Sequence, residues 1–304
     1  MAKYVVKRVL LAILTIFIVS AITFFSMYAI PGGPFSSEKA LSPAVMAALE
    51  ARYGLDQPVP VQYVNYMSRL LFHHDFGVSL KTGRDVFETI TTGMQVSAKL
   101  GLSAAAVAIA FGLVLGSVAA LNRGKVIDRI IVFFTTLATS APSFVLATLL
   151  LLVFCVQLRW FPVWSAENPN YVLPVVSLAL YPMAYITRLT KTSMLDALSQ
   201  DYVRTARAKG VPQVKVIFKH ALRNALIPVI TYVGPMVASI ITGSMVVENI
   251  FTIGGLGSQF VSGINNRDYP IIMATTLFLG ALMISANLIT DLVYKVIDPR
   301  IELE

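Results

Sequence analysis

Charged side chains, histidine and cysteine are scarce in this sequence of 304 residues. Only 13% of the residues are charged, three are His and one is Cys. His73 and His74 are adjacent, His220 stands alone, and neither an HExxH nor a GxSxG motif occurs, which excludes the usual metal and acyl-transfer sites. The single cysteine, Cys155, excludes a disulfide framework within the chain. We therefore expect no catalytic residue and no metal site here.

A nucleotide-binding loop is missing as well. A P-loop requires Gly-x4-Gly-Lys-Ser/Thr, whereas the richest glycine run, TIGGLGSQF at 252–260, contains no Lys. The chain is therefore predicted not to be an enzyme and not to hydrolyse ATP. Ion-coupled carriers place ionisable residues deep in the membrane. Only Asp291 qualifies in this sequence, and Lys295 four residues later predicts a simple helical ion pair.

Apolar residues dominate the composition. Hydrophobic residues make up 56% of the chain and the mean hydropathy is +0.73, which is typical of a membrane protein. A spanning helix needs about 20 apolar residues, and we expect six such helices, at 9–30, 100–121, 130–156, 171–186, 225–247 and 271–296. The first is too long for a signal-peptide core and lacks a small-x-small cleavage site, so we expect it to be retained.

The distribution of Lys and Arg predicts the orientation of these helices. With the N-terminus inside, sixteen of the 24 Lys and Arg fall in inside segments, as the positive-inside rule requires. This predicts a multi-pass protein of the cell membrane with both termini in the cytoplasm. The net charge of +8 then reflects topology, and because no nucleic-acid-binding motif accompanies it, we expect no nucleic-acid partner.

The extracytoplasmic segment at 31–99 is too long for a simple loop. Ser42, Pro43 and Gly54 supply a cap, a first helical residue and a stop, which predicts a short helix at 43–53. A second helix is predicted in PVPVQYVNYMSRLLFHH at 58–74, interfacial or packed on the bundle through one face, namely Tyr63, Tyr66, Met67 and Leu70 or Leu71. These helices would form a small cap on the outer mouth.

Small residues and prolines mark two of the predicted spans. The second span carries a ladder at four-residue spacing, which permits close helix packing either within the chain or at a subunit seam: Ala108, Gly112, Gly116 and Ala120. The fifth span carries Pro228 and Pro235, and prolines in spans are tolerated where neighbouring helices or a water-filled cavity satisfy the freed carbonyls. It is either a pathway-lining helix or a packing kink, and the candidate pathway residues are Thr231, Gly234, Pro235 and Ser239.

The segment DYVRTARAKGVPQVKVIFKHALRNALIP, at 201–228, is the least apolar long stretch of the C-terminal half. Gly210 and Pro212 predict a stop and a restart between two helices. In the second helix, apolar residues at helical spacing predict one buried face: Val214, Ile217, Phe218, Ala221 and Leu222. The segment either attracts anionic lipid and sets topology, or docks a cytoplasmic partner. Lipid attraction alone requires neither the break at Gly210 nor the spacing from Ala206 to Gly210.

At RTARAKG the sequence resembles the cytoplasmic signature of ABC-importer permeases, Glu-Ala-Ala-x3-Gly-x9-Ile-x-Leu-Pro. Ala206, Gly210 and Leu222 match, whereas Arg204 and Thr205 replace Glu-Ala. The whole chain resembles the oligopeptide/dipeptide subfamily of these permeases through further segments that occur in the same order: YGLDQPVPVQY, DFGVSL, APSFVLATLLLL, LPVVSLALYPMAYITRLTKTSMLDAL and VVENIFTIGGLG.

This resemblance implies an all-α type I ABC-importer permease fold: the first span at 1–30, the extracytoplasmic segment at 31–99, a permease core at 100–297 with a coupling loop at about 191–224, and a tail at 298–304. It further implies partners, namely a second homologous permease, two cytoplasmic ATPases that hold ATP and Mg, and an extracytoplasmic binding protein that delivers peptides. The residues expected at the ATPase contact are Asp201, Arg204, Ala206, Gly210 and Pro212. The alternatives are a stand-alone secondary carrier or channel and, less favoured, a membrane-embedded hydrolase.

Overall fold

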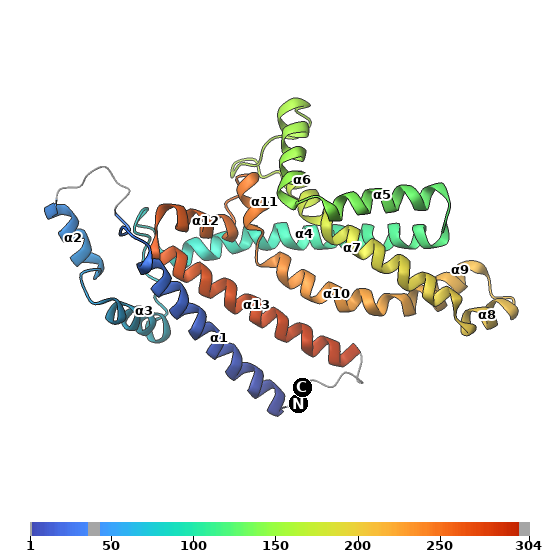
Figure 1. Ribbon diagram of the computed structural model, residues 1–304, viewed down its shortest axis with the longest axis horizontal. Helices are drawn as coiled ribbons and strands as arrows, with labels where there is room; N and C mark the ends of the chain where they lie inside the picture. The colour runs from blue at the N-terminus through green and yellow to red at the C-terminus, as the bar shows by residue number, and fades with distance from the viewer. Residues whose placement is uncertain (1, 36–42, 298–304) are drawn as a thin grey trace.

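The computed structural model describes residues 2–35 and 43–297, and within them the fold is all-helical without strands. The long helices are α1 (Ala2–Ala29), α4 (Val86–Leu121), α7 (Val172–Ser199), α10 (Arg223–Ile241) and α13 (Tyr269–Ile297) (Figure 1). Five helical segments among the described residues are long and apolar enough to cross a membrane. A sixth crossing is reached if the bent pair of α5 (Val126–Ser140) with α6 (Ser143–Leu150) and η1 (Leu151–Gln157) counts as one span. The predicted all-helical membrane fold is thus confirmed.

The small-residue ladder of α4 packs inside the chain. A Cβ atom on Gly112 would lie 2.7 Å from the Cβ of Ile186, and one on Gly116 would lie 2.6 Å from the carbonyl oxygen of Thr187, both on α7. On another side of α4, a Cβ on Gly101 would lie 2.7 Å from the carbonyl oxygen of Ile240 at the end of α10. The ladder therefore packs α4 onto α7, which agrees with the interpretation of the ladder as packing within the chain, and Gly101 allows the approach of α10.

Helix α4 begins at Val86, well before the apolar stretch predicted from Leu100. Asp85 is its N-cap, and the Asp85 carboxylate accepts a hydrogen bond of 2.9 Å from the backbone N–H of Glu88. The sequence Asp-Val-Phe-Glu has the spacing of a capping box. Hydropathy alone missed this start because the first turns of the helix are polar.

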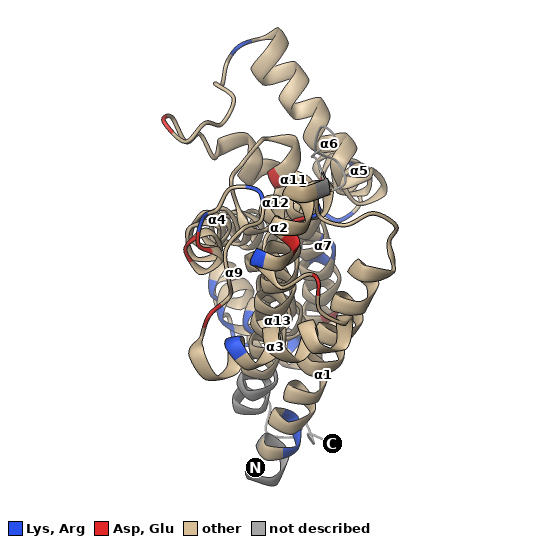
Figure 2. Ribbon diagram, turned by 90° about the vertical axis from the view of Figure 1, so that its left-hand side faces the viewer, with Lys and Arg blue, Asp and Glu red and all other residues tan. Residues whose placement is uncertain are grey.

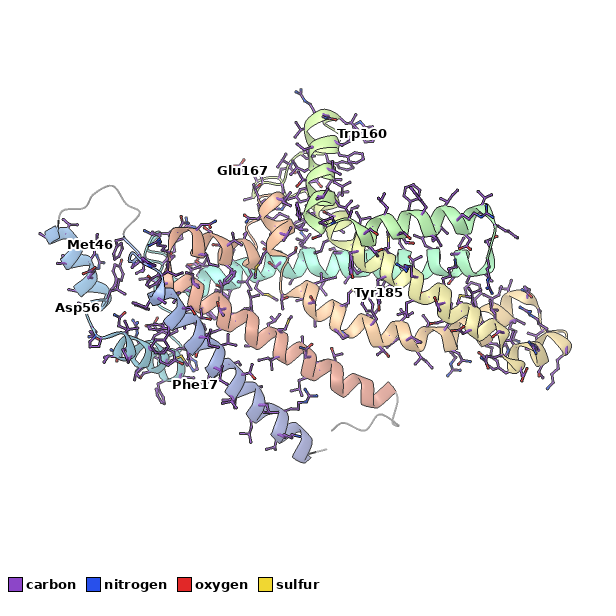
Figure 3. The ribbon with its side chains drawn as sticks, in the orientation of Figure 1. Phe17, Met46, Asp56, Trp160, Glu167 and Tyr185 are labelled. Carbon is purple, nitrogen blue, oxygen red and sulfur yellow. The ribbon has the colours of Figure 1, made fainter. Side chains whose placement is uncertain are left out.

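Pro142 divides the third predicted span. Ala141 has an extended backbone (φ −81°, ψ 134°), as expected for a residue before proline, and α5 meets α6 at 107°. The arm formed by α6 and η1 leaves the bundle, with Trp160 near its far end (Figures 1 and 3). The span predicted at 130–156 is therefore divided into two helical segments at Pro142.

The fourth predicted span is much longer than its apolar run at 171–186. Helix α7 continues to Ser199 and tolerates Pro182 in its interior. Lys191 in its second half forms an ion pair with Asp128, whose carboxylate also accepts a hydrogen bond of 3.0 Å from the backbone N–H of Gly124. This ion pair ties the α4–α5 connection to α7.

One end of the bundle holds the α4–α5 connection at 122–125 and the α7–α10 connection at 200–222; we call it the basic end because of its Lys and Arg residues. The opposite end, called the cap end, carries α2 (Pro43–Tyr53), α3 (Val59–His73), α11 (Met245–Ile250) and α12 (Leu256–Asn266). Figure 2 looks at the bundle from the cap end and shows how few charged residues the helices carry.

Both predicted cap helices are confirmed, and α3 is packed on the bundle. Its Tyr63 hydroxyl lies 2.7 Å from the hydroxyl of Ser20 on α1, and the Tyr63 ring packs against Phe24. Leu71 is exposed, so Leu70 is the residue that completes the packed face. The predicted pair of Asp291 and Lys295 lies outside the residues whose side chains the structure describes.

Candidate functional site

The basic end carries a helical elbow made of α8 (Asp201–Ala208), the turn at 209–212, α9 (Gln213–Lys215) and η2 (Val216–Leu222). The backbone N–H of Val211 donates to the carbonyl of Ala206 at 3.2 Å, and the N–H of Gly210 donates to that of Arg207 at 3.0 Å. This is a Schellman motif, in which the residue after the helix adopts the left-handed region. Gly210 does so with φ +72°, which confirms the predicted turn.

The five residues predicted at the elbow do not share one role. Asp201 and Arg204 are exposed and form a weak ion pair of 3.4 Å with each other. Ala206 instead points inward and packs with Val203 and Val216. Ala206 therefore holds α8 against η2, whereas the other four predicted residues face the solvent, namely Asp201, Arg204, Gly210 and Pro212.

The amphipathic face predicted after Pro212 is confirmed for Ile217, Ala221 and Leu222, which pack together, but not for its other two residues. The structure forms a π-helix at η2, with hydrogen bonds from i to i+5, so residues five apart share a face. Val216 and Ala221 are accordingly buried, whereas Val214 and Phe218 are 67% and 64% exposed. The elbow therefore presents an apolar pair beside its turn, which the periodicity of an α-helix would have buried.

A cavity of about 680 Å³ lies beside α10 in the middle of the bundle. Pro235 and Ser239 line it, as predicted for a pathway helix, but Thr231 and Gly234 do not. The other lining residues come from the α5–α6 junction, α7, α10 itself and the start of α11, and they are Thr139, Ser140, Ala141, Pro142, Ser143, Ser177, Leu178, Tyr181, Pro182, Tyr232, Met236, Ile240, Ser244 and Val247. The bend at Pro142, which sequence analysis missed, thus forms one wall of this cavity.

The cavity wall is uncharged and rich in hydroxyl groups. The Ser177 hydroxyl is buried and has no hydrogen-bond partner among the described residues. Tyr232 is held against Tyr185 of α7, with ring centroids 4.3 Å apart. Such a wall offers hydrogen bonds to a polar solute without selecting for its charge.

A water-accessibility experiment tests this assignment. With Cys155 first replaced by Ser, we expect Ser239→Cys to react with a membrane-impermeant thiol reagent, because Ser239 lines the cavity. Leu137→Cys is a matched control, since Leu137 is 51% exposed on α5 but lines a separate apolar groove. Labelling of Leu137→Cys at the rate of Ser239→Cys, or no labelling of Ser239→Cys, would contradict a water-filled pathway at this cavity.

A buried carboxylate fixes the turn between α10 and α12, and sequence analysis missed it. Glu248 is fully buried, and its carboxylate accepts hydrogen bonds from the Ser97 hydroxyl of α4 at 2.7 Å and the Ser258 backbone N–H at 3.0 Å. The Ser97 hydroxyl in turn accepts a 2.8 Å bond from the N–H of Leu256. A Cβ on Gly255 would lie 2.5 Å from this carboxylate, so the glycine makes the approach possible.

The signal for this site in the sequence is the group of glycines on both sides of Glu248. Gly243, Gly255 and Gly257 all approach the Glu248 side chain. A search for acids inside apolar runs overlooked Glu248 because it directly follows the fifth run, which ends at Val247. The Glu248 site joins the part of α4 nearest the cap end to α11, and Val247 of α11 lines the cavity.

Comparisons with known proteins found two matching family models and similar proteins along the whole chain. The family model described as "Binding-protein-dependent transport system inner membrane component" matches residues 112–303, and "Binding-prot-dependent transport system membrane comp, N-term" matches residues 1–100. The chain is 47% identical to the dipeptide transport system permease protein DppB of Bacillus subtilis, over 100% of this chain and 99% of that protein. It is 43% identical to the oligopeptide transport system permease protein OppB of Haemophilus influenzae, over 99% of each.

Two solved structures share the fold at low sequence identity. An amino acid ABC transporter superposes with a TM-score of 0.56 at 14% identity, over 69% of this chain and 94% of that one. The MetNI methionine ABC transporter, in an inward-facing conformation, superposes with a TM-score of 0.58 at 15% identity, over 69% of this chain and 97% of that one. These likenesses show the fold, and the family models together with the relatives at 47% and 43% identity show that the chain belongs to the inner membrane component family of binding-protein-dependent transport systems.

Proposed function

We propose that this chain is a permease subunit of an ATP-driven importer of peptides. The relatives at 47% and 43% identity are named as dipeptide and oligopeptide permeases, which supports a peptide as the cargo. The observation that carries the proposal is a continuous helical connection. The elbow at the basic end runs through η2 directly into α10, and α10 lines the cavity with Pro235 and Ser239.

This connection gives the elbow the form of a lever. Two ATPase subunits bind the pair of permeases, and one of them contacts this chain at the basic end, through Asp201, Arg204 and the exposed pair of Val214 and Phe218. When they close on ATP, the elbow moves as a rigid body, because Ala206 packs α8 onto η2. The motion passes along α10 to the cavity and shifts the population between outward-open and inward-open states. The chain itself supplies the pathway and the lever, and the ATP is hydrolysed on its partners.

The cavity forms one half of a pathway that a second, homologous permease completes. The described residues that line the cavity come from α5, α6, α7, α10 and α11 of this chain, and they surround it on one side only. The uncharged, hydroxyl-rich lining suits peptide backbones with varied side chains, so selection of the peptide rests on the binding protein that delivers it. The excess of Lys and Arg at the basic end supports a cytoplasmic location of this end and of both termini.

Purification of the complex tests this function. We expect affinity-tagged chain to bring down a second permease and an ATPase, and we expect peptide uptake into cells that express the complex to stop when ATP is depleted at a constant membrane potential. Uptake by the chain alone in vesicles, driven by an ion gradient, would contradict the proposal and identify a secondary carrier. The arm of α6 and η1 offers a control, since its distance from the elbow predicts that tagging near Trp160 leaves ATPase recovery unchanged.

A further inference from the structure

A second cavity lies at the cap end and is not used by the proposed function. It encloses about 850 Å³ between α1, α2, α3, the start of α13 and the connection at 76–83, and we call it the cap pocket. It shares no lining residue with the cavity beside α10. Its volume is in the range of small-molecule sites.

One of the residues that line this pocket, Tyr66, carries an unsatisfied hydroxyl. Tyr66 of α3 is 8% exposed, and its hydroxyl has no hydrogen-bond partner among the described residues. Buried polar groups are nearly always paired, and an unpaired one destabilises the protein unless a ligand or water satisfies it. Burial raises the pKa of Tyr66, and the nearby Asp75 adds to this whereas Arg69 opposes it, so the hydroxyl remains protonated and can donate a hydrogen bond.

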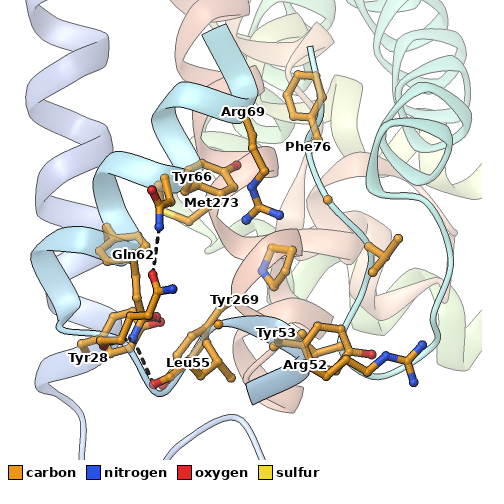
Figure 4. A pocket seen from close by; sticks show the side chains of 18 of the residues that line it. Tyr28, Arg52, Tyr53, Leu55, Gln62, Tyr66, Arg69, Phe76, Tyr269 and Met273 are labelled. Carbon is orange, nitrogen blue, oxygen red and sulfur yellow. Dashed lines mark hydrogen bonds between the residues drawn. The ribbon is translucent and has the colours of Figure 1, made fainter. Parts of the chain in front are cut away.

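The charge of the pocket is positive. Arg69 lies one helical turn after Tyr66, and Figure 4 shows its guanidinium pointing into the cavity near the Tyr66 ring. Arg52 of α2 contributes a second cation to the wall, and neither Asp nor Glu is among the lining residues. Within the described part of the chain, the Arg69 guanidinium has no ion-pair partner. A guanidinium beside a phenolic donor matches a carboxylate, which accepts from both at once.

The remaining walls are aromatic and amide-bearing, and they are fixed in place. The Asn65 amide donates to the side-chain oxygen of Gln57 at 2.9 Å, and the Gln62 amide donates to the Gln57 carbonyl at 2.7 Å. The Tyr28 hydroxyl donates to the other end of the Gln62 amide. The aromatic rings of the wall are Phe24, Tyr28, Tyr53, Phe76 and Tyr269. A ligand with one acidic group and an apolar body would therefore enter a largely preformed site.

We propose that the cap pocket binds a small carboxylate with an aromatic or aliphatic body, such as an N-acylated amino acid, whose carboxylate accepts hydrogen bonds from Arg69 and the Tyr66 hydroxyl. The acyl chain of a phospholipid fits this site less well, because amide side chains and Arg52 interrupt the apolar wall along which it would lie. The proposal does not depend on peptide import, since the cap pocket is separate from the cavity beside α10.

Binding measurements on the full chain in nanodiscs of zwitterionic lipid test this site. The probes are N-acetylphenylalanine and its carboxamide, followed by equilibrium dialysis without ATP or partner subunits. We expect the acid to bind and the carboxamide to bind roughly tenfold more weakly or worse, as is typical for loss of a charged hydrogen-bond partner. Arg69→Met and Tyr66→Phe should each weaken binding of the acid by about the same factor. Arg84→Met is the matched control, because Arg84 is exposed at the same end but does not line the pocket.

Tyr66→Phe separates a ligand-binding role from a structural one. It keeps the ring and removes only the unpaired hydroxyl, so we expect unchanged or higher thermal stability together with weaker binding of the acid. Equal binding of the acid and the carboxamide, or binding of the acid that Arg69→Met leaves unchanged, would overturn the proposal. It would also be overturned if the acid failed to bind while phosphatidylglycerol bound in a manner sensitive to Arg69→Met, since the site would then hold a lipid. None of these results bears on ATP-driven uptake.

Discussion

Gly210→Val is expected to abolish ATP-driven peptide uptake while leaving the amount of protein in the membrane unchanged. A Cβ on Gly210 meets no atom within 4 Å, so the substitution causes no clash. The cost lies in the backbone, because φ is +72° and a β-branched residue is strongly disfavoured there. The Schellman turn would open, and α8 would lose its fixed angle to α10. Uptake of a labelled peptide, together with quantitative blotting of membranes, measures both effects.

Gly210→Asn is the matched control, because Asn adopts left-handed conformations more readily than other side chains. It should retain most of the uptake. Ala206→Glu should reproduce the effect of Gly210→Val from inside the elbow, since Ala206 is 7% exposed and a carboxylate there would separate α8 from η2. Normal uptake in Gly210→Val or in Ala206→Glu would refute the proposal that the elbow transmits movement from the ATPases to α10.

Gly116→Leu is expected to destabilise the folded chain by about 3 kcal/mol or more, at the upper end of the range for overpacked interiors. A Cβ at this position would lie 2.6 Å from the backbone oxygen of Thr187 and from the Cβ of Thr190, and neither can move without displacing α7. Close approach of backbones is the main contribution of small residues to helix association in lipid. Thermal unfolding of the detergent-solubilised chain, followed by size-exclusion chromatography, measures the loss.

Gly280→Leu gives the comparison for this experiment. Gly280 also lies in a spanning helix, α13, but a Cβ there meets no atom within 4 Å. The same change in side-chain volume and helix propensity should therefore leave the melting temperature nearly unchanged. Equal destabilisation by both substitutions would show that close packing of α4 on α7 is not what Gly116 provides.

The sequence allowed prediction of the features that depend on local chemistry. Hydropathy located the apolar part of each span, although α4 and α7 extend well beyond it, and the cap and stop residues around Pro43 and Gly54 gave the bounds of α2. Gly210 and Pro212 likewise predicted the turn of the elbow. In these places the preferred backbone conformation of single residues decides the structure, and neighbouring segments agree with it.

The features that escaped prediction depend on contacts between distant segments or on competing local signals. The site of Glu248 requires Ser97, which lies on another helix, to satisfy the buried carboxylate. The bend at Pro142 was within reach of the sequence, but the apolar run on both sides of it concealed the break. Of the four predicted pathway residues, α10 turns only Pro235 and Ser239 toward the cavity, because the position of α7 sets which face of α10 is covered.

The π-helix of η2 makes this segment the place where the chain can lose a residue without reorienting the elbow. A segment with hydrogen bonds from i to i+5 holds one residue more than the α-helix it replaces. Deleting a single residue within Val216–Leu222 would restore α-helical geometry there, and the elbow would keep nearly the same direction relative to α10. Deleting a residue from the regular α-helix Arg223–Ile241 would instead turn everything before it by about 100° around the helix axis. Single-residue deletions should therefore be tolerated better in η2 than in α10, because the wider turn of η2 absorbs the loss and the regular helix cannot.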